Sequence, residues 1–146
     1  MTVTTPNAAG IVLPARTSWF TRRDAKAARL KAAAPYCNGK VLKTASIVDA
    51  LQAVLKAGDR VALEGDNQKQ ADFLSRALAK VDPAVIHDIH LLISTISRAE
   101  HLDIFETGIA RKLDFSFAGP QSLRVAQLLE DGKLEIGRAS CRERVS

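Results

Sequence analysis

The chain has few cysteines and no long apolar run, and each absence excludes a class of protein. Its 146 residues include two cysteines, too few for a disulfide framework, and Cys37 and Cys141 lack the C-x-x-C spacing of a zinc site. No apolar run approaches the roughly 18 residues that span a membrane, and the N-terminus lacks the order of a signal peptide. The sequence therefore predicts a cytoplasmic protein with a core of ordinary size.

Positive charge is also scarce in the middle of the chain, although the net charge of the whole chain is +5. Residues 1–43 hold eight Lys or Arg and one acid, residues 44–135 hold ten and fourteen, and residues 136–146 hold three and one. An argument for nucleic-acid binding therefore rests on the two ends. Residues 21–34 favour a basic helix, which is either a solvated surface or a docking surface for an acidic partner.

The motifs of several common catalytic sites are missing as well. The sequence has no G-x-S-x-G, no G-x-x-x-x-G-K-[ST], no G-x-G-x-x-G and no H-E-x-x-H, which argues against nucleotide hydrolysis and zinc-peptidase chemistry. His87, Asp88 and His90 are spaced like metal ligands. On a strand, however, His87 and His90 would point to opposite faces. We expect no metal site here and histidines that are ordinary hydrogen-bonded residues.

Helical and strand-like patterns alternate along the chain. Helices are expected at 21–34, 47–57, 68–80, 100–109 and 122–131, and strands at 40–42, 59–63, 85–93, 113–117 and 133–136. Ser46, Ser97 and Ser122 are candidate helix caps. The run that ends in Leu91, Leu92 and Ile93 does not alternate, as expected of a central strand that is buried on both faces. The alternation predicts parallel β-α-β units, that is, an α/β fold with a mostly parallel sheet and flanking helices.

Polar residues and glycines follow three of the predicted strands. They are Glu64, Gly65, Asn67, Gln68 and Lys69 after the strand at 59–63, Ser94 and Thr95 after the strand at 85–93, and Gly119 and Gln121 after the strand at 113–117. The carboxyl ends of parallel strands share one edge, where ligands bind in open sheets. If Asn67 caps the next helix, free N–H groups can face an anion. The alternative, that Asn67 is only a cap and Gly119 only a turn residue, stays open.

Three separated blocks resemble one family in both order and spacing. They are EGDNQKQADFL (64–74), HLDIFETGIARKLDFSFAGPQ (101–121) and GKLEIG (132–137). Together they resemble the N-terminal part of the alpha subunit of biotin-independent malonate decarboxylase, and the resemblance runs from about residue 21 to residue 137. It implies a CoA-transferase-like α/β fold.

The resemblance also implies a reaction, in which acetyl-S-acyl carrier protein and malonate give malonyl-S-acyl carrier protein and acetate. The implied partners are the acyl carrier protein subunit and the malonyl-carrier decarboxylase subunits, with no nucleic acid and no membrane. No cofactor would be bound directly, because the subunit would act on the CoA-derived prosthetic group of the carrier. Gly65, Asn67, Gln68, Gly119 and Gln121 would hold the thioester arm or malonate, and Lys69 would offer a cation to the malonate carboxylate.

Family members continue for several times this length, so the resemblance implies a truncated domain. We expect a flexible leader at 1–20, the N-terminal part of the domain at 21–137 and a non-native tail at 138–146, which resembles the translation of a sequencing-library adapter. In related CoA transferases the acyl-accepting glutamate comes from the later half of the fold, and no residue here matches it. Glu64 is the catalytic candidate, with a solvated turn carboxylate as the alternative. We expect the fragment itself to be inactive.

Two further interpretations stay open. One is the alpha subunit of citrate lyase or another CoA transferase, which a different acceptor acid would reveal. The other is a non-catalytic binding module whose basic helix docks an acidic partner, and nucleic acid is the weaker version of this partner.

Overall fold

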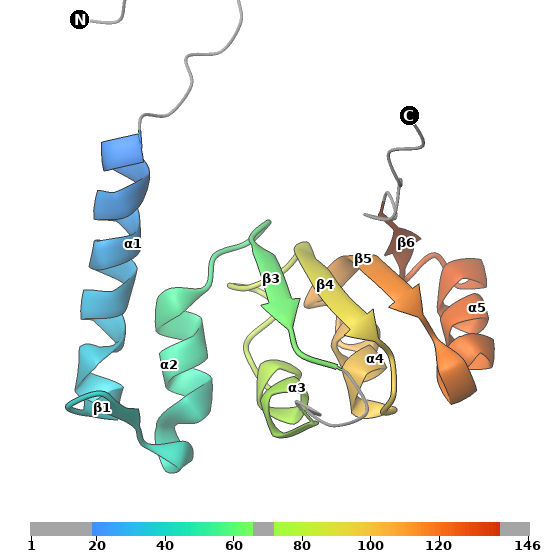
Figure 1. Cartoon of the computed structure of the whole chain (residues 1–146), viewed down its shortest axis with the longest axis horizontal. Coiled ribbons are helices and arrows are strands. Elements are labelled where there is room, and N and C mark those ends of the chain that lie inside the picture. The colour runs from blue at the N-terminus through green and yellow to red at the C-terminus, as the bar shows by residue number, and fades with distance from the viewer. Residues whose placement is uncertain (1–18, 66–71, 138–146) are drawn as a thin grey trace, which may run out of the picture.

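The computed structural model describes residues 19–65 and 72–137 of the chain (Figure 1). Its helices are α1 (Trp19–Ala33), α2 (Ile47–Val54), α3 (Asp72–Leu78), α4 (Glu100–Glu106) and α5 (Ser122–Glu130), with short 3-10 turns η1 (Ala34–Tyr36), η2 (Thr44–Ser46) and η3 (Gly119–Gln121). Its strands are β1 (Cys37–Asn38), β2 (Val41–Leu42), β3 (Arg60–Leu63), β4 (Ile89–Thr95), β5 (Ala110–Phe117) and β6 (Glu135–Ile136).

Four of the strands form one parallel sheet in the order β3-β4-β5-β6. Each strand pairs in parallel with the next one along the chain, as β-α-β units produce when a helix connects every pair. The interior strand β4 buries Ile89, Leu91 and Ile93 on one face. The predicted mostly parallel α/β sheet with flanking helices is confirmed, whereas burial of β4 on both faces is wrong for the described residues, because Ser94 on the other face is exposed.

The strand β4 begins at Ile89, later than the predicted start at residue 85, because Asp82 holds the preceding residues in a turn. The Asp82 carbonyl accepts the N–H groups of Val85 and Ile86 at 3.0 and 2.9 Å. Asp88 then has a φ of +54°, in the left-handed region. His87 therefore lies in a turn, so the prediction that it points from a strand opposite to His90 is wrong.

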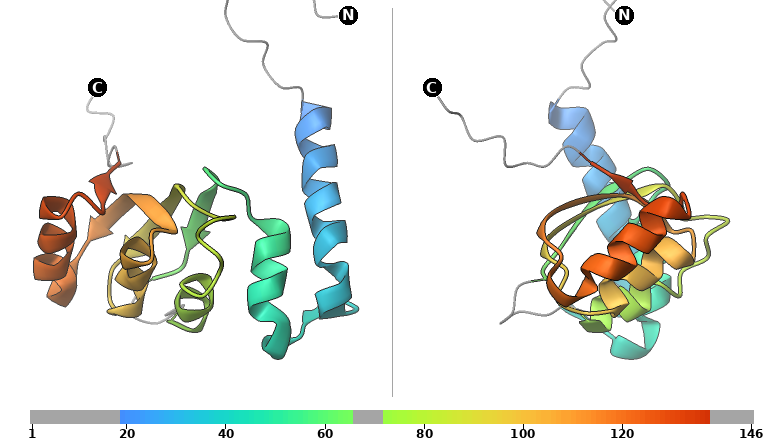
Figure 2. Two further views of the ribbon diagram at one scale, coloured as in Figure 1. Left: turned by 180° about the vertical axis from the view of Figure 1, so that it is seen from behind. Right: turned by 90° about the vertical axis from the view of Figure 1, so that its right-hand side faces the viewer.

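The helices α3, α4 and α5 all cover one face of the sheet, as both the front view and the view from behind show (Figures 1 and 2). The core lies between these helices and the strands, and its fully buried side chains include Phe105, Ile86, Ile89, Leu91, Ile96, Leu102, Ile104, Ile109 and Leu113. On the opposite face Ala62, Ser94 and Ser116 are exposed. Within the described residues, this opposite face has no covering layer.

The buried side of α3 differs from the predicted one. Ala77 and Leu78 are buried, as predicted, but Phe73 and Leu74 are 45% and 40% exposed, and Ser75 is fully buried instead. Phe73 lines a groove together with Val48 of α2. Because α2 packs beside α3, Phe73 faces the groove between these two helices.

The segment from α1 to α2 forms an arm at one end of the sheet (Figure 1). β1 and β2 pair as a two-stranded antiparallel hairpin within it, across the predicted Asn38-Gly39 turn. α2 joins the arm to the sheet, since Val48, Leu51 and Leu55 pack against the core. None of the helices in the described ranges has the length and hydropathy to cross a membrane.

Candidate functional site at the carboxyl edge of the sheet

The ends of β3, β4 and β5 meet along one edge of the sheet. The register places Leu63 beside Ile93 and Thr95 beside Phe117. The Ile96 N–H donates to the Phe117 carbonyl at 2.9 Å, which continues the pairing one residue beyond β4. The segments that start at residues 64, 96 and 118 therefore leave the sheet side by side.

Gly65 is the residue at this edge whose identity the packing dictates. It is buried, and a Cβ added to it would overlap Ile93 Cγ1 and lie 2.5 Å from the Thr95 carbonyl oxygen. The Ser97 hydroxyl donates to the Gly65 carbonyl at 3.4 Å. Ser97 is thus not the predicted cap of α4, where no side-chain cap bond forms. Glycine lets the end of β3 approach the end of β4 without a side chain between them.

Gly119 and Gln121 lie in the turn η3 that follows β5. Gly119 has a φ of +51°, a region that glycine enters without strain, and a Cβ there would lie 3.1 Å from the Phe117 ring. The Gln121 N–H donates to the Ala118 carbonyl at 3.0 Å and closes the turn. Because β4 separates β3 from β5 and neighbouring strands lie about 4.8 Å apart, the ends of β3 and β5 are roughly 10 Å apart across the sheet.

Glu64 is exposed and is already engaged in at least one polar or packing interaction. Asn67, Gln68 and Lys69 lie outside the described residues, so the helix cap and the cation expected there stay predictions. Among the side chains that the structure places around this edge, Thr95, Ser97 and Gln121 are half-buried neutral donors and acceptors.

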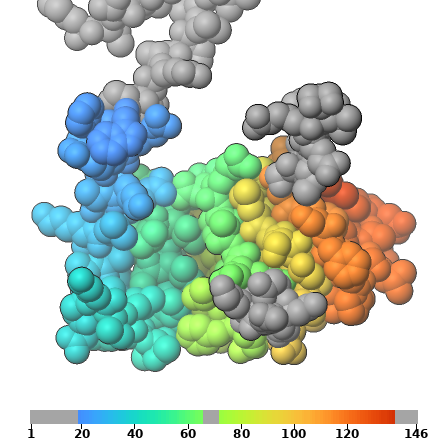
Figure 3. Space-filling view, in the orientation of Figure 1, coloured from blue at the N-terminus to red at the C-terminus, as the bar shows by residue number. Residues whose placement is uncertain are grey.

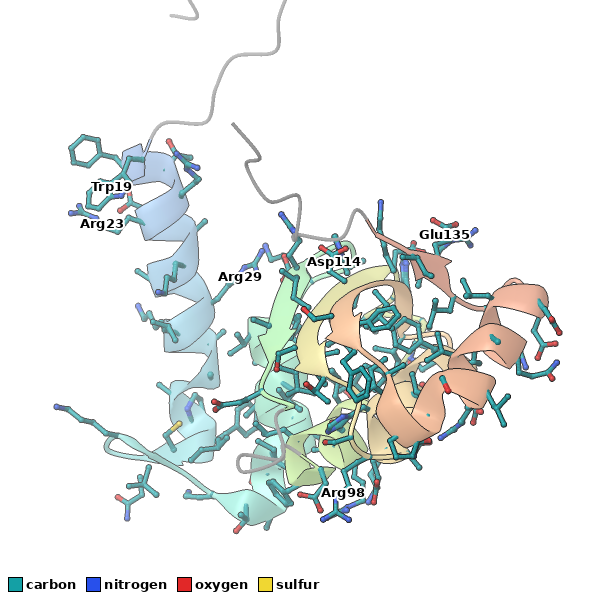
Figure 4. The ribbon with its side chains drawn as sticks, turned by 45° about the vertical axis from the view of Figure 1, so that its right-hand side comes forward. Trp19, Arg23, Arg29, Arg98, Asp114 and Glu135 are labelled. Carbon is teal, nitrogen blue, oxygen red and sulfur yellow. The ribbon has the colours of Figure 1, made fainter. Side chains whose placement is uncertain are left out.

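Arg76 of α3 links α3 to α4, and both helices begin near this edge. In Figure 4 the label of Arg98 marks the region just before α4. The Nη1 atom of Arg76 lies 2.9 Å from Asp72 Oδ2 and 3.2 Å from Glu100 Oε1. The Arg76 hydrogen bond lowers the pKa of Asp72. A backbone hydrogen bond within Glu100, followed by the Arg76 bond, lowers the pKa of Glu100. Both carboxylates are therefore ionised at neutral pH, in the first turns of their helices, where negative charge is favoured.

His101, in the first turn of α4, is fully buried, and neither ring nitrogen has a hydrogen-bond partner among the described residues. Burial lowers the pKa of this imidazole below its ordinary value of 6.5, because the charged form loses its hydration. His101 is therefore neutral at pH 7. The sequence carries no signal for this burial, since a histidine in an amphipathic helix is as often exposed.

A second polar cluster, which the sequence does not predict, lies on the face of the sheet opposite α3, α4 and α5 (Asp114 is labelled in Figure 4). Asp114 is 7% exposed, and its Oδ2 lies 2.9 Å from His90 Nε2 and 3.4 Å from Arg60 Nη2. The approach of His90 is within ion-pair distance but off the direction of a hydrogen bond, and Asp114 Oδ1 has no hydrogen bond among the described residues. The backbone of Gly137 lies so close that a Cβ there would overlap Oδ1.

His87 and His90 do not share a site. His87 Nδ1 lies 2.8 Å from Asp88 Oδ2 within the turn, whereas His90 contacts Asp114 on the sheet. Across residues 19–65 and 72–137, no group of three or more His, Cys, Asp or Glu side chains is placed to hold a metal ion.

The fold and the site together define a class of protein: a parallel α/β domain with close-packed glycines and neutral polar groups at the carboxyl edge of its sheet. A family model described as "Malonate decarboxylase, alpha subunit, transporter" matches residues 18–142. The chain belongs to this family of malonate decarboxylase alpha subunits.

Three relatives show how much of such a subunit the chain represents. It is 47% identical over 102 residues to the acetyl-S-ACP:malonate ACP transferase of Malonomonas rubra, covering 70% of this chain and 18% of that protein. The malonate decarboxylase alpha subunit of Acinetobacter baumannii superposes with a TM-score of 0.80 at 56% identity, over 84% of this chain and 23% of that one. A chain of a Pseudomonas malonate decarboxylase hetero-tetramer, solved with malonate, superposes with a TM-score of 0.79 at 57% identity, over 87% and 23%.

The chain therefore spans about a fifth of the length of these relatives. The CoA-transferase-like relationship stays a prediction, because these relatives are described as malonate decarboxylases and as a carrier-protein transferase. The expected leader and the expected non-native tail also stay predictions, since residues 1–18 and 138–146 lie outside the described residues.

Proposed function

We propose that the protein of which this chain is part transfers the acyl carrier protein from acetyl-S-acyl carrier protein to malonate. The acetyl thioester bond breaks, a malonate carboxyl forms the new thioester with the same sulfur, and acetate leaves with the displaced oxygen. The observation that carries this proposal is the 47% identity to the Malonomonas rubra protein, which is named for this reaction. Membership of the malonate decarboxylase alpha subunit family supports it.

The carboxyl edge is the part of this chain that suits the role. A pantetheine thioester is uncharged and rich in amides, so neutral hydrogen-bonding side chains and a backbone that can come close to the ligand suit its binding. Thr95, Ser97 and Gln121 are such groups, and Gly65 keeps side-chain bulk out of the gap between β3 and β4. Lys69 would balance the charge of malonate, as the sequence predicts.

The acyl-accepting carboxylate belongs, in this proposal, to the part of the subunit beyond this chain. Glu64 is an exposed carboxylate that follows β3, whereas a carboxylate nucleophile has to be held in a substrate pocket and directed at the thioester carbon. The isolated chain would then bind part of the substrate and catalyse no transfer.

The partners follow from the same proposal. They are the acyl carrier protein with its CoA-derived prosthetic group and the subunits that decarboxylate the malonyl thioester. The Pseudomonas relative is described as one component of a hetero-tetramer, which supports an assembly of several subunits. A cytoplasmic location is part of this proposal.

The test uses the full-length subunit with acetyl-S-acyl carrier protein and labelled malonate. We expect malonyl-S-acyl carrier protein and acetate to form in equal amounts. Absence of malonate-dependent acetate release would overturn the proposal. Release with citrate and not with malonate would favour the citrate lyase alternative.

The role of the edge has a matched pair of variants. Gln121→Ala removes a neutral donor at the edge, and we expect transfer to fall about tenfold in kcat/KM, since one lost hydrogen bond to a bound substrate costs roughly that factor. Gln127→Ala removes an exposed glutamine of α5 that bonds Asp131, and we expect a change of less than about twofold. Equal effects of the two variants would show that the carboxyl edge of the sheet is not part of the substrate site.

A further inference from the structure

The N-terminal half of α1 extends beyond the helix on which it packs. A helix of 15 residues is about 22 Å long, and the 8 residues of α2 cover about 12 Å. The contacts that hold α1 come from its C-terminal half, where Arg29 reaches Val54 and Asp59 and Ala33 is buried. The other half projects past the end of α2 and away from the sheet, as the ribbon and the space-filling view both show (Figures 1 and 3).

Aromatic and basic side chains are concentrated on this projecting half. Trp19 and Phe20 are 62% and 63% exposed, and Trp19 and Arg23 point away from the sheet (Figure 4). The Arg23 guanidinium lies 5.2 Å from the centre of the Trp19 ring and 5.4 Å from that of Phe20. Two exposed rings held under a cation form an apolar anchor with a positive rim, a composition that is common where proteins dock.

A shallow groove runs along the same surface. One hollow of about 420 Å³ is lined by Trp19, Arg22, Arg23 and Lys26. A second hollow of about 410 Å³ shares Arg22 and Lys26 and continues to Leu30 and Val54. We call the combined surface the α1 groove, and define it by Trp19, Arg22, Arg23, Lys26 and Leu30.

The cations of the α1 groove have almost no acidic partners within the described part of the chain. Arg22 and Lys26 form no ion pair there, and Arg23 reaches only Asp24, at 3.8 Å. The arginines of the sheet region differ, because Arg60, Arg76, Arg111 and Arg124 each lie within 3.4 Å of a carboxylate. The positive potential of the groove is therefore available to an outside partner.

We propose that the α1 groove docks an acidic face of the acyl carrier protein. This inference rests on the proposed function, which supplies the carrier as the substrate. Three closely spaced cations complement a carboxylate-rich protein surface, and the edges of the two rings offer an apolar contact at its centre. Nucleic acid fits less well, because residues 44–135 carry more acidic than basic side chains.

The test compares two full-length variants with the same change of charge. Arg22→Glu/Arg23→Glu/Lys26→Glu reverses the charge of the groove, and Lys40→Glu/Lys43→Glu/Lys56→Glu reverses three exposed lysines outside it. We expect the groove variant to raise the dissociation constant for the carrier protein at least about tenfold, as reversal of charges at an interface does. The control should change it less than about twofold.

Kinetics separate docking from chemistry. With acetyl-S-acyl carrier protein, the groove variant should raise KM with little change in kcat, and its KM should lose most of the salt dependence of the parent protein. With a carrier-free acetyl thioester of dephospho-CoA, both variants should match the parent protein. Loss of activity on the carrier-free thioester would overturn the docking role, while the transfer reaction itself would stand. If no protein transfers acyl groups but the binding difference persists, the docking holds and the proposed function fails.

Accessibility provides a further check. A cysteine placed by Arg23→Cys should react with a water-soluble thiol reagent in the free subunit and be protected when apo-carrier protein is added. Protection in the free subunit would show that the subunit itself, or a second copy, covers the groove, and would overturn the proposal. Tighter binding of RNA or DNA than of the carrier would overturn it as well.

Discussion

The sheet region and the arm differ in how far their apolar side chains are buried and their charged side chains are paired. In the sheet region, apolar residues are buried against three helices and the arginines pair with carboxylates, as Arg124 does with Asp103 and Glu106 at 2.7 and 2.8 Å. In the arm, Trp19, Phe20 and Leu30 are exposed, and most cations have no partner in the described chain. The sheet region is complete on its helical side, whereas the arm is suited to contacts with something outside it.

The largest expected effect comes from comparing the same kind of substitution, leucine to alanine, in the two regions. Leu91→Ala should cost about 2–5 kcal/mol, because Leu91 is fully buried in β4 and its loss leaves a cavity. Leu30→Ala should cost less than about 0.5 kcal/mol, because Leu30 is 57% exposed. Hydrogen exchange of the β4 and α1 amides in the full-length subunit measures both effects. Similar costs would show that a partner or another part of the subunit buries Leu30.

The second effect concerns the close contact at the edge of the sheet. Gly65→Ala should destabilise the β3 and β4 amides by about 1–3 kcal/mol, because the new Cβ overlaps Ile93 and the Thr95 carbonyl. Adding Ile93→Ala should recover only part of this loss, since the contact with the Thr95 backbone remains. Full recovery would show that the side-chain overlap alone matters, and α1 should be unaffected in either variant.

The third effect tests how the arm is attached. Asp59 accepts two hydrogen bonds from Arg29 and one from the Lys56 N–H, the last at 2.9 Å. Asp59→Ala should therefore loosen α1 by about 1 kcal/mol, which hydrogen exchange would detect as roughly a fivefold change confined to the arm. Asp24→Ala removes only the 3.8 Å contact with Arg23 and should leave exchange unchanged. An effect that spreads into β4 would contradict the independence of the two regions.

Near neutral pH, the smallest effect is a pH dependence that belongs to the sheet region alone. The pKa of His101 is lowered by burial from its ordinary 6.5, so the unfolded chain binds the proton first as the pH falls. Stability of α4 should therefore decrease below about pH 6.5 and be fully present above it, with a slope of at most about 1.4 kcal/mol per pH unit. His101→Leu should remove the slope. An equal slope in α1, once intrinsic exchange rates are corrected, would assign it to another group.

Local sequence signals account for most of the fold. The alternation of strands and helices predicts a parallel sheet, because connections in β-α-β units are short and right-handed. It places α1, α2 and α5 within a few residues, and the central strand differs mainly in its start, where Asp82 forms a turn that β propensity does not reveal. Ser46 is the N-cap residue of α2, as predicted, although its side chain makes no cap bond. The other two predicted caps are wrong, because Ala99 and Gln121 take the N-cap positions of α4 and α5.

Features that depend on strand register or on tertiary packing could not be predicted from the sequence. The contact of Asp114 with His90 and Arg60 needs three strands aligned on one face, and no spacing along the chain reports that alignment. The inward side of α3 depends on the position of α2, which turns Phe73 away from the sheet. For Gly65, the sequence correctly singles out the position as special, but only the structure shows that the reason is the approach of Ile93 and Thr95.

The strand order carries a consequence for how the chain is made. Within residues 19–65 and 72–137, every strand of the four-stranded sheet pairs with its nearest neighbour in sequence, from β3 through β6. The pairing of these four strands needs no distant segment of the described chain, so the entropy of closing each connection stays small and assembly is fast for a parallel sheet. During synthesis, each β-α-β unit can add to the edge left by the previous one as it leaves the ribosome. The sheet region can thus grow in one direction, and the arm that precedes it in the sequence is synthesised before the first parallel pair.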